Sequence, residues 1–299
     1  FAMLPGEIAV VEMAVAAGLP LVGERRNAGA TTTYGVGQLI AAALDHGAKQ
    51  VILGLGGSAT NDGGCGAAAA LGVEFRNAAG ELFVPVGGTL KEIVSISLAH
   101  AHPLIKSVPF TAMCDIDNPL CGENGASAVF GPQKGADDAM VVCLDEGLRH
   151  LADVVNRDLG RDILNLPGSG AAGGFGGGSV AFFNSSLRMG IDIVLDITRF
   201  DHLAAGADMV LTGEGKLDSQ SLRGKVVIGV ARRAKKIDVP VAALVGASET
   251  NIAEVYEEGV SGVFPINPMP QPFEVVREQA EENLRFTVRN LMRYTERLR

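Results

Sequence analysis

The sequence predicts an α/β fold built on a doubly wound, mostly parallel sheet. Short apolar segments alternate with amphipathic ones along much of the chain, most regularly after Ile191. Such alternation is typical of βαβ units, in which helices connect parallel strands. The length of 299 residues, with 47% hydrophobic and 20% charged residues, is enough for two packed domains or one large one.

In the first half of the chain, the pattern predicts three helices and two strands around glycine-rich loops. Threonines precede apolar residues at helical spacing within 30–47, and a strand, VILGL, follows at 51–55. An alanine-rich helix runs to Leu71, and a second strand covers roughly 110–115. Residues 137–159 place their apolar side chains on one face, which predicts a long amphipathic helix.

The second half reads as a regular series of strands and helices. We predict strands at 191–197, 208–212, 239–246 and 262–266, and helices at 224–236, 252–257 and 273–297. Glycine-rich or acidic loops separate them. Ligands of such folds bind at the carboxyl ends of the strands, so the loops that follow strands are the first places to look for a site.

Charge and cysteine content exclude several classes of function. The net charge of −9 disfavours nucleic acid and anionic membrane surfaces as partners. The opening segment contains Glu7 and Glu12 and has no preceding basic stretch, so it predicts neither a signal peptide nor a membrane span. The four cysteines lack metal-ligand spacing and predict free thiols in a reducing, cytoplasmic setting.

Three glycine-rich loops are candidates for phosphate binding: 54–64 (GLGGSATNDGG), 168–178 (GSGAAGGFGGG) and 212–225 (TGEGKLDSQSLRGK). Consecutive backbone N–H groups in such loops can converge on phosphate oxygens. None matches the P-loop pattern GxxxxGK[ST]. In the second loop we expect Gly173, Gly174 and Gly176 to present bare amides to substrate or nucleotide, so that alanine at Gly174 and Gly176 weakens binding while the melting temperature changes little.

The first loop also allows a second interpretation. Gly54, Gly56 and Ala59 fit GxGxxA, and Glu74 lies twenty residues beyond Gly54, as in the dinucleotide fingerprint of a Rossmann fold. An NAD-dependent oxidoreductase is therefore the alternative. Against it, Asn61 and Asp62 keep this segment in a loop and place a carboxylate where pyrophosphate would lie.

Two acidic clusters complete the candidate chemistry. Asp115 and Asp117 alternate next to a predicted strand, so their carboxylates share one side, with Asn118 beside them. These oxygens suit Mg²⁺, or one carboxylate could accept a proton from a substrate hydroxyl; turn capping is the structural alternative. Glu214, Lys216 and Asp218 form the second cluster, in which the lysine could hold a phosphate or carboxylate.

Taken together, these segments resemble the bacterial type I glycerate kinase family. The resemblance covers nearly the whole chain in order, through VVEMAVAAGLPLV, TTTYGVGQLI, GLGGSATNDGGCGAAAALG, CDIDNPLCGENGASAVFGPQKGA, GSGAAGGFGGG, GIDIVLDI and DMVLTGEGKLDSQSLRGKVVIGVARRAKKIDVPVAALVGA. It implies transfer of the γ-phosphoryl group of ATP to D-glycerate with Mg²⁺, giving ADP and 2-phosphoglycerate. The family's amino-terminal strand, with its DSFKG-like and DGGEG-like segments, is not in this sequence.

The resemblance also implies a domain arrangement and roles for residues. An inserted α/β domain would span 1–197, and 198–299 would be the remainder of the split, Rossmann-like domain. Asp115 or Asp218 would act as base, Lys216 would bind phosphate and Asp117 the metal. The remaining binding residues would be Gly56, Gly57, Ser58, Asn61, Asp62, Asn118 and Glu214. A homodimer is an open alternative to a monomer.

Overall fold

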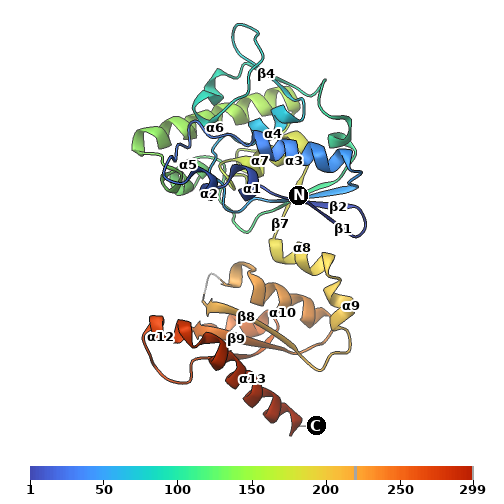
Figure 1. Ribbon diagram of the computed structural model, residues 1–299, viewed down its shortest axis with the longest axis vertical. Coiled ribbons are helices and arrows are strands. Elements are labelled where there is room, and N and C mark those ends of the chain that lie inside the picture. The colour runs from blue at the N-terminus through green and yellow to red at the C-terminus, as the bar shows by residue number, and fades with distance from the viewer. Residues whose placement is uncertain (219–220, 298–299) are drawn as a thin grey trace. The chain divides into compact units, whose positions relative to one another are not determined.

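The computed structural model describes residues 1–218 and 221–297, which fold into two compact units, Phe1–Arg188 and Met189–Arg299 (Figure 1). Each unit is a mixed α/β structure around a mostly or entirely parallel sheet, which confirms the predicted fold class. The units divide after Arg188, nine residues before the boundary expected from the sequence.

The first unit contains a five-stranded sheet in the order β1-β2-β3-β6-β7. Only the β1–β2 pair is antiparallel, and the other neighbours are parallel. A separate antiparallel pair, β4–β5, lies outside this sheet. The strands are β1 (Ala2–Leu4), β2 (Ile8–Glu12), β3 (Gln50–Gly54), β4 (Glu74–Arg76), β5 (Ser95–Ser97), β6 (Phe110–Met113) and β7 (Ser186–Arg188).

Helices of the first unit cover one face of its main sheet. Alternate residues of the central strands, including Val51 and Leu53 of β3, join the apolar core formed with α3, α4, α6 and α7. The helices are α1 (Ala14–Ala17), α2 (Leu19–Val22), α3 (Tyr34–Asp45), α4 (Cys65–Ala70), α5 (Ala126–Phe130), α6 (Asp138–Leu159) and α7 (Phe175–Phe183); the 3-10 helices are η1 (Gly87–Glu92), η2 (Pro103–Lys106) and η3 (Pro132–Lys134).

The long helix α6 forms where the sequence predicts it. Asp137 precedes the helix and accepts a hydrogen bond from the backbone N–H of Met140 at 2.8 Å, a side-chain cap worth about 1 kcal/mol. Leu144, Leu148 and Leu151, at helical spacing, are completely buried against the core. The helix ends at Gly160, whose φ of +67° suits glycine.

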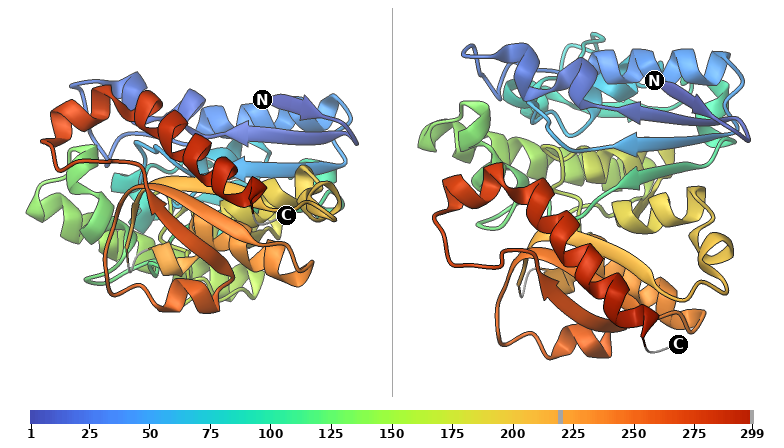
Figure 2. Two further views of the ribbon diagram at one scale, coloured as in Figure 1. Left: turned by 90° about the horizontal axis from the view of Figure 1, so that it is seen from below. Right: turned by 60° about the horizontal axis from the view of Figure 1, so that its bottom comes forward.

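The second unit contains a three-stranded parallel sheet in the order β10-β9-β8. Alternate residues of β9, Val241, Ala243 and Val245, pack against α10 and α11 on one face, while α13 crosses the other face (Figure 2). The elements are α8 (Gly190–Ile197), α9 (Phe200–Ala204), β8 (Val210–Leu217), η4 (Ser221–Arg223), α10 (Val226–Lys236), β9 (Val241–Ser248), α11 (Glu254–Glu257), β10 (Val260–Pro265), α12 (Phe273–Glu278) and α13 (Ala280–Glu296).

Three sequence-based assignments in the second unit are wrong. Residues 190–197 form helix α8 instead of a strand, and Ile191 packs against Gly229 of α10. Strand β8 runs to Leu217 and takes in the first part, 212–217, of the segment predicted to be a loop. The terminal helix is two helices, α12 and α13, separated at Gln279.

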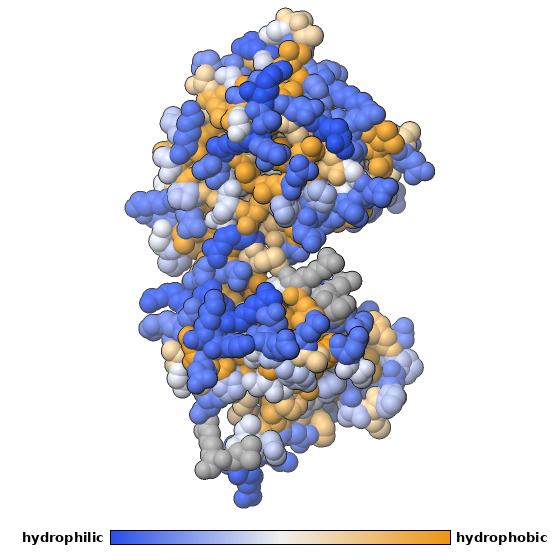
Figure 3. Space-filling view, turned by 180° about the vertical axis from the view of Figure 1, so that it is seen from behind, coloured by the Kyte–Doolittle hydropathy of each residue, from blue (hydrophilic) through white to orange (hydrophobic). Residues whose placement is uncertain are grey.

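All four cysteines have free thiols, as the sequence predicts, with Cys143 exposed and the other three buried. No helix within 1–218 or 221–297 combines the length and apolar character needed to cross a bilayer. One face of the molecule shows hydrophilic side chains interspersed with smaller apolar areas (Figure 3). Dispersed exposed apolar side chains are ordinary on protein surfaces.

Candidate functional site

A pocket of about 330 Å³ opens in the first unit at the carboxyl ends of β3 and β6. Its walls include Gly56, Gly57 and Ser58, from the loop after β3, and Asp115, from the loop after β6. Since β3 and β6 are parallel neighbours, their following loops emerge at the same edge of the sheet. The structure thus brings together two segments that the sequence analysis had selected separately.

Backbone hydrogen bonds fix the glycine-rich loop after β3 to α1 and α2. The carbonyl of Gly57 accepts a hydrogen bond from the N–H of Leu19 at 3.0 Å, and the N–H of Ala59 donates to the carbonyl of Ala17 at 2.8 Å. Gly57 has a φ of +73°, which a side chain would strain. A side chain at Gly56 would enter open space, so this stretch of backbone lies directly on the pocket.

Lys134, which the sequence analysis did not select, lines the same pocket. It ends η3, and its side chain is 2% exposed. Its Nζ donates to Ser58 Oγ at 2.8 Å and to the carbonyl oxygen of Thr60 at 2.7 Å. Burial lowers the pKa of the ammonium group to about 8, and the negative charge of Asp62 limits that fall. The only sequence signal was a lysine inside a Gly-Pro turn, GPQKG, which resembles an ordinary exposed turn.

Asp62 is a structural carboxylate and does not face the pocket. It is completely buried and accepts hydrogen bonds from the N–H and the hydroxyl of Thr33, at 2.7 and 2.8 Å, and from the N–H groups of Gly64 and Gly66. Burial raises the pKa of the Asp62 carboxyl, and these hydrogen bonds partly offset the rise. The Asp62 oxygens connect the loop to the start of α3, which favours a structural role over the ligand contact that we expected.

Asn61 is also buried, and its Nδ2 donates to Ser127 Oγ at 3.1 Å. Its Oδ1 has no hydrogen-bond partner among the described residues. Asn118 lies at the other loop, where its Nδ2 donates to the carbonyl of Asn124 at 2.8 Å and its own carbonyl accepts from the N–H of Gly170. These hydrogen bonds of the two asparagines help to shape the loops.

Asp115 and Asp117 follow β6 and are both exposed. Asp115 lines the 330 Å³ pocket, whereas Asp117 does not. Within the described parts of the chain, no three His, Cys, Asp or Glu side chains converge as a metal site would require. Mg²⁺ commonly needs only one or two protein carboxylates because substrate phosphates and water complete its shell. Asp115 and Asp117 fit that limited role, as one or two carboxylate ligands.

The second glycine-rich segment is closely packed at Gly173, Gly174 and Gly176, the three glycines that we expected to meet substrate or nucleotide. A Cβ at Gly173 would lie 2.0 Å from the carbonyl oxygen of Thr60, and one at Gly176 would lie 2.2 Å from that of Gly168. At Gly174, with φ of +89°, a Cβ would lie 2.8 Å from Leu148 Cδ2. Gly173, Gly174 and Gly176 are all buried around the start of α7, as is Phe175. Alanine at Gly174 and Gly176 should therefore lower the melting temperature.

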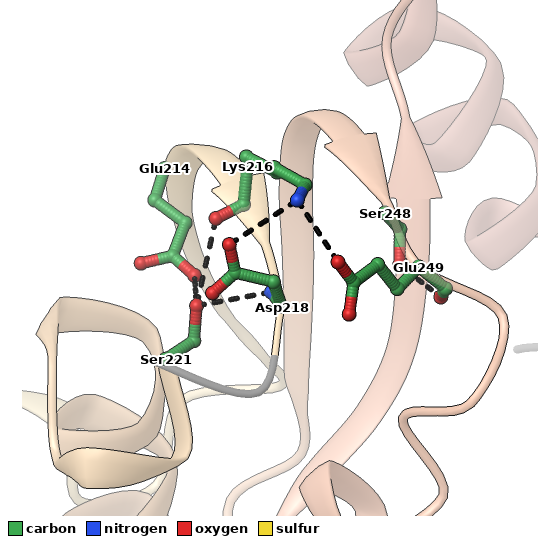
Figure 4. Close-up of polar contacts among 6 residues, drawn as sticks. All are labelled: Glu214, Lys216, Asp218, Ser221, Ser248 and Glu249. Carbon is green, nitrogen blue, oxygen red and sulfur yellow. Dashed lines mark hydrogen bonds and ion pairs between the residues drawn. The ribbon is translucent and has the colours of Figure 1, made fainter.

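The acidic cluster of the second unit lies at the end of β8 (Figure 4). Glu214, Lys216 and Asp218 occupy alternate positions, which places their side chains on one side of the strand. Lys216 Nζ lies 2.9 Å from Glu249 Oε1 and 3.4 Å from Asp218 Oδ2. These two carboxylates raise the pKa of Lys216, Glu249 having the larger effect. Glu249, after β9, was missed because it lies 33 residues away in sequence.

Ser221 links the remaining members of this cluster (Figure 4). Its hydroxyl donates to Glu214 Oε1 at 2.5 Å and accepts from the backbone N–H of Asp218 at 3.2 Å. The Ser221 hydroxyl therefore holds both the Glu214 carboxylate and the backbone of Asp218. The loop prediction also included Ser219 and Gln220, which lie outside the described residues.

A larger pocket, of about 1050 Å³, lies beside this cluster within the second unit. Glu214 and Lys216 form part of its wall, and apolar side chains from β9, α12 and α13, among them Leu244, Phe273 and Leu284, form much of the rest. Its volume is at the upper end of the range for small-molecule sites, and its apolar walls with a few polar groups are usual for them.

The dinucleotide alternative does not fit this structure. A Rossmann fingerprint needs a helix that begins within the glycine motif, but α4 begins only at Cys65, beyond the loop. Glu74 would have to meet a ribose, yet it lies on β4, bound to Arg76 and His100. The GxGxxA match is therefore a coincidence of loop composition.

Comparisons with known proteins point to one family. The chain matches the glycerate kinase family over residues 1–296. It is 49% identical to glycerate kinase of Bacillus cereus (strain ATCC 10987 / NRS 248) over 284 residues, which are 95% of this chain and 74% of that protein. Glycerate 2-kinase of Escherichia coli K12 is 44% identical over 262 residues, 87% of this chain and 69% of that one.

A solved structure is also similar. The crystal structure of a protein from Salmonella typhimurium LT2, assigned as glycerate kinase 2, superposes with a TM-score of 0.83 and 42% identity, covering 97% of this chain and 76% of that one. Sequence and structure thus match the same family over nearly the whole chain. This chain belongs to the glycerate kinase family.

Proposed function

We propose that this protein transfers the γ-phosphoryl group of ATP to D-glycerate, giving ADP and 2-phosphoglycerate. The observation that carries the proposal is the 49% identity to a glycerate kinase over 95% of the chain. The position of the phosphorylated hydroxyl rests on the 44% identity to a protein named glycerate 2-kinase. Both candidate clusters consist of the groups that phosphoryl transfer uses, namely carboxylates, lysines and loop amides.

Phosphoryl transfer asks little covalent chemistry of the protein. It requires positioning of the two substrates, neutralisation of negative charge and a group that takes the proton of the attacking hydroxyl. Asp115, exposed in a pocket wall of the first unit, and Asp218, beside Lys216 in the second, are the two candidates for this base. A carboxylate within hydrogen-bond reach of a hydroxyl serves in this way when substrate is bound.

In this proposal Lys216 binds phosphate oxygens. Its carboxylate neighbours raise its pKa, so it stays protonated near neutral pH and its ammonium group can donate hydrogen bonds to phosphate oxygens. Glu214 and Glu249 then act as positioning residues, through Ser221 and through Lys216 respectively. Mg²⁺ accompanying ATP would be held by Asp117, alone or with Asp115, and would neutralise charge on the transferred group.

The same proposal includes a cytoplasmic location, a small-molecule substrate and either a monomer or a homodimer. A soluble metabolite and a nucleotide cofactor suit an enzyme without membrane or nucleic-acid partners, in line with the net charge of −9. Light scattering coupled to gel filtration distinguishes the two oligomeric states, since the chain mass is 31.0 kDa.

The test is an ADP-release assay with D-glycerate, ATP and Mg²⁺. We expect turnover with D-glycerate, none when glycerate is omitted, and a product that enolase converts, because enolase consumes 2-phosphoglycerate. ATP with Mg²⁺ should also raise the melting temperature, since a ligand stabilises the state that binds it. Absence of ADP release at saturating substrates, with the protein folded, would contradict the proposal, and a product resistant to enolase would contradict its regiochemistry.

A further inference from the structure

The pocket of the first unit contains a buried positive charge that no carboxylate of the described chain neutralises directly. Lys134 is 2% exposed, and its two hydrogen-bond acceptors, Ser58 Oγ and the Thr60 carbonyl, are uncharged. An ammonium group has three N–H donors, so one remains for another acceptor. Burying a charge without a counter-ion is unfavourable, and a bound anion would relieve that cost.

Backbone amides add to this positive region. Among the described residues, none accepts a hydrogen bond from the amide N–H of Gly56, Gly57 or Ser58. All three residues line the pocket, as does Lys134. The Ser58 hydroxyl accepts from Lys134 and can still donate its own proton to a ligand. Consecutive free amides next to a lysine form a site that binds oxygen atoms carrying negative charge.

The size and charge of the pocket indicate which anion it takes. A volume of about 330 Å³ is near the lower limit for ligand pockets and suits a molecule of a few heavy atoms. Asp115 lines the same pocket, so its lining carries one positive and one negative side chain. A triphosphate with several negative charges would meet the Asp115 carboxylate, whereas a singly charged hydroxy acid can place its carboxylate at Lys134 and its hydroxyls toward Asp115.

Building on the proposed function, we propose that this pocket binds the carboxylate of the hydroxy acid substrate and that Lys134 selects for its negative charge. The carboxylate accepts hydrogen bonds from the Lys134 ammonium group, from the Ser58 hydroxyl and from the amides of Gly56 and Gly57. Lys134 is thus a residue that binds substrate and determines its specificity, and the nucleotide binds elsewhere.

The test compares D-glycerate with glyceramide, its uncharged amide, by titration calorimetry on the full chain without nucleotide. The wild type should bind D-glycerate at least about tenfold more tightly, since charge-assisted hydrogen bonds contribute more than neutral ones. Lys134→Met and Lys134→Gln remove the charge, and Gln keeps hydrogen-bond donors. Both should lose that preference, with ATP affinity unchanged. Lys106→Met, at an exposed lysine of the same unit, should behave as wild type.

Three outcomes would overturn the inference. If the wild type binds D-glycerate and glyceramide equally well, the pocket does not select for negative charge. That result overturns the inference whether or not the variants fold. An equal loss of affinity for both ligands in the Lys134 variants would make the lysine a structural support of the loop. A loss of ATP affinity alone would make this a phosphate site. If the wild type binds D-glycerate selectively but releases no ADP, the proposed function fails and this inference stands.

Discussion

The two units hold their candidate lysines in opposite ways. Lys134 in the first unit is 2% exposed and contacts uncharged oxygens, and its pKa falls to about 8. The side chain of Lys216 in the second unit is 55% exposed and pairs with Glu249 and Asp218, and its pKa is raised. The first charge is desolvated and lacks a direct counter-ion, whereas the second is hydrated and neutralised by neighbours.

Because of this difference, we expect the two lysines to affect the stability of the protein to different extents. A buried charge without a counter-ion in direct contact lowers stability, and a bound anion would restore it, so folding of the first unit should be coupled to binding. An exposed ion pair contributes little to stability because water and salt screen it, so the second unit can change its charges with little effect on folding. The close packing of Gly173, Gly174 and Gly176 also makes the stability of the first unit sensitive to substitution, since close-packed backbone tolerates no added atoms.

The largest expected effect tests that packing. Gly176 and Gly35 are both the second residue of a helix, α7 and α3. Gly176→Ala would place a Cβ 2.2 Å from the Gly168 carbonyl oxygen, whereas in Gly35→Ala the nearest atom is 3.4 Å away. We expect urea unfolding to show a loss of about 3 kcal/mol or more for Gly176→Ala and no loss for Gly35→Ala. Equal stability of the two variants would show that the backbone around Gly176 shifts to accommodate a methyl group at little cost.

The next effect concerns pH. The pKa of Lys134 is lower in the folded state, about 8, than the ordinary 10.5. Between these values the unfolded chain binds more protons, so stability rises with pH relative to a Lys134→Met variant. The gain across this window is at most roughly 3 kcal/mol, from about 1.4 kcal/mol per tenfold change in proton affinity. Urea unfolding of both proteins from pH 7 to 10.5 measures it; parallel curves would mean that Lys134 is solvated.

Substitution of the two candidate bases shows which unit supplies the proton acceptor. We expect Asp218→Asn or Asp115→Asn to lower kcat at least about a hundredfold, or about 2.7 kcal/mol in activation free energy, with little change in unfolding. The one with the larger effect on kcat is the better candidate for base. Asp238→Asn, at an exposed aspartate of the second unit, serves as control. Near-normal turnover in both variants would remove both residues from the mechanism.

The smallest effect is the stability of a Lys216→Met variant. Because the side chain is half exposed and its partners are hydrated, its urea midpoint at pH 7 should equal that of the wild type. The Michaelis constant for ATP should rise nonetheless, since the proposed phosphate contact is lost. A clearly lowered midpoint would show that Lys216 holds the second unit together and would erase its contrast with Lys134.

Local patterns in the sequence predicted much of the fold correctly. The helix from Asp138 to Leu159 follows from its apolar spacing and from the cap at Asp137, both of which act within one or two turns. The strand 191–197 was predicted wrongly because a short apolar run suits either structure, and its packing against Gly229 decided for a helix. Such decisions depend on neighbours that are remote in sequence.

For the candidate site, sequence motifs selected two loops that the structure brings to one pocket, but they did not predict the contacts of each residue. The loops after β3 and β6 were predictable because glycine and acidic residues follow apolar strands, and parallel strands bring such loops to one edge. Only the tertiary structure showed that Asp62 is buried, that Gly173, Gly174 and Gly176 leave no room for a Cβ, and that Lys134 contacts Ser58 across 76 residues. Burial and long-range contact decide whether a polar side chain supports a loop or meets a ligand, and neither can be read from a residue's immediate neighbours in sequence.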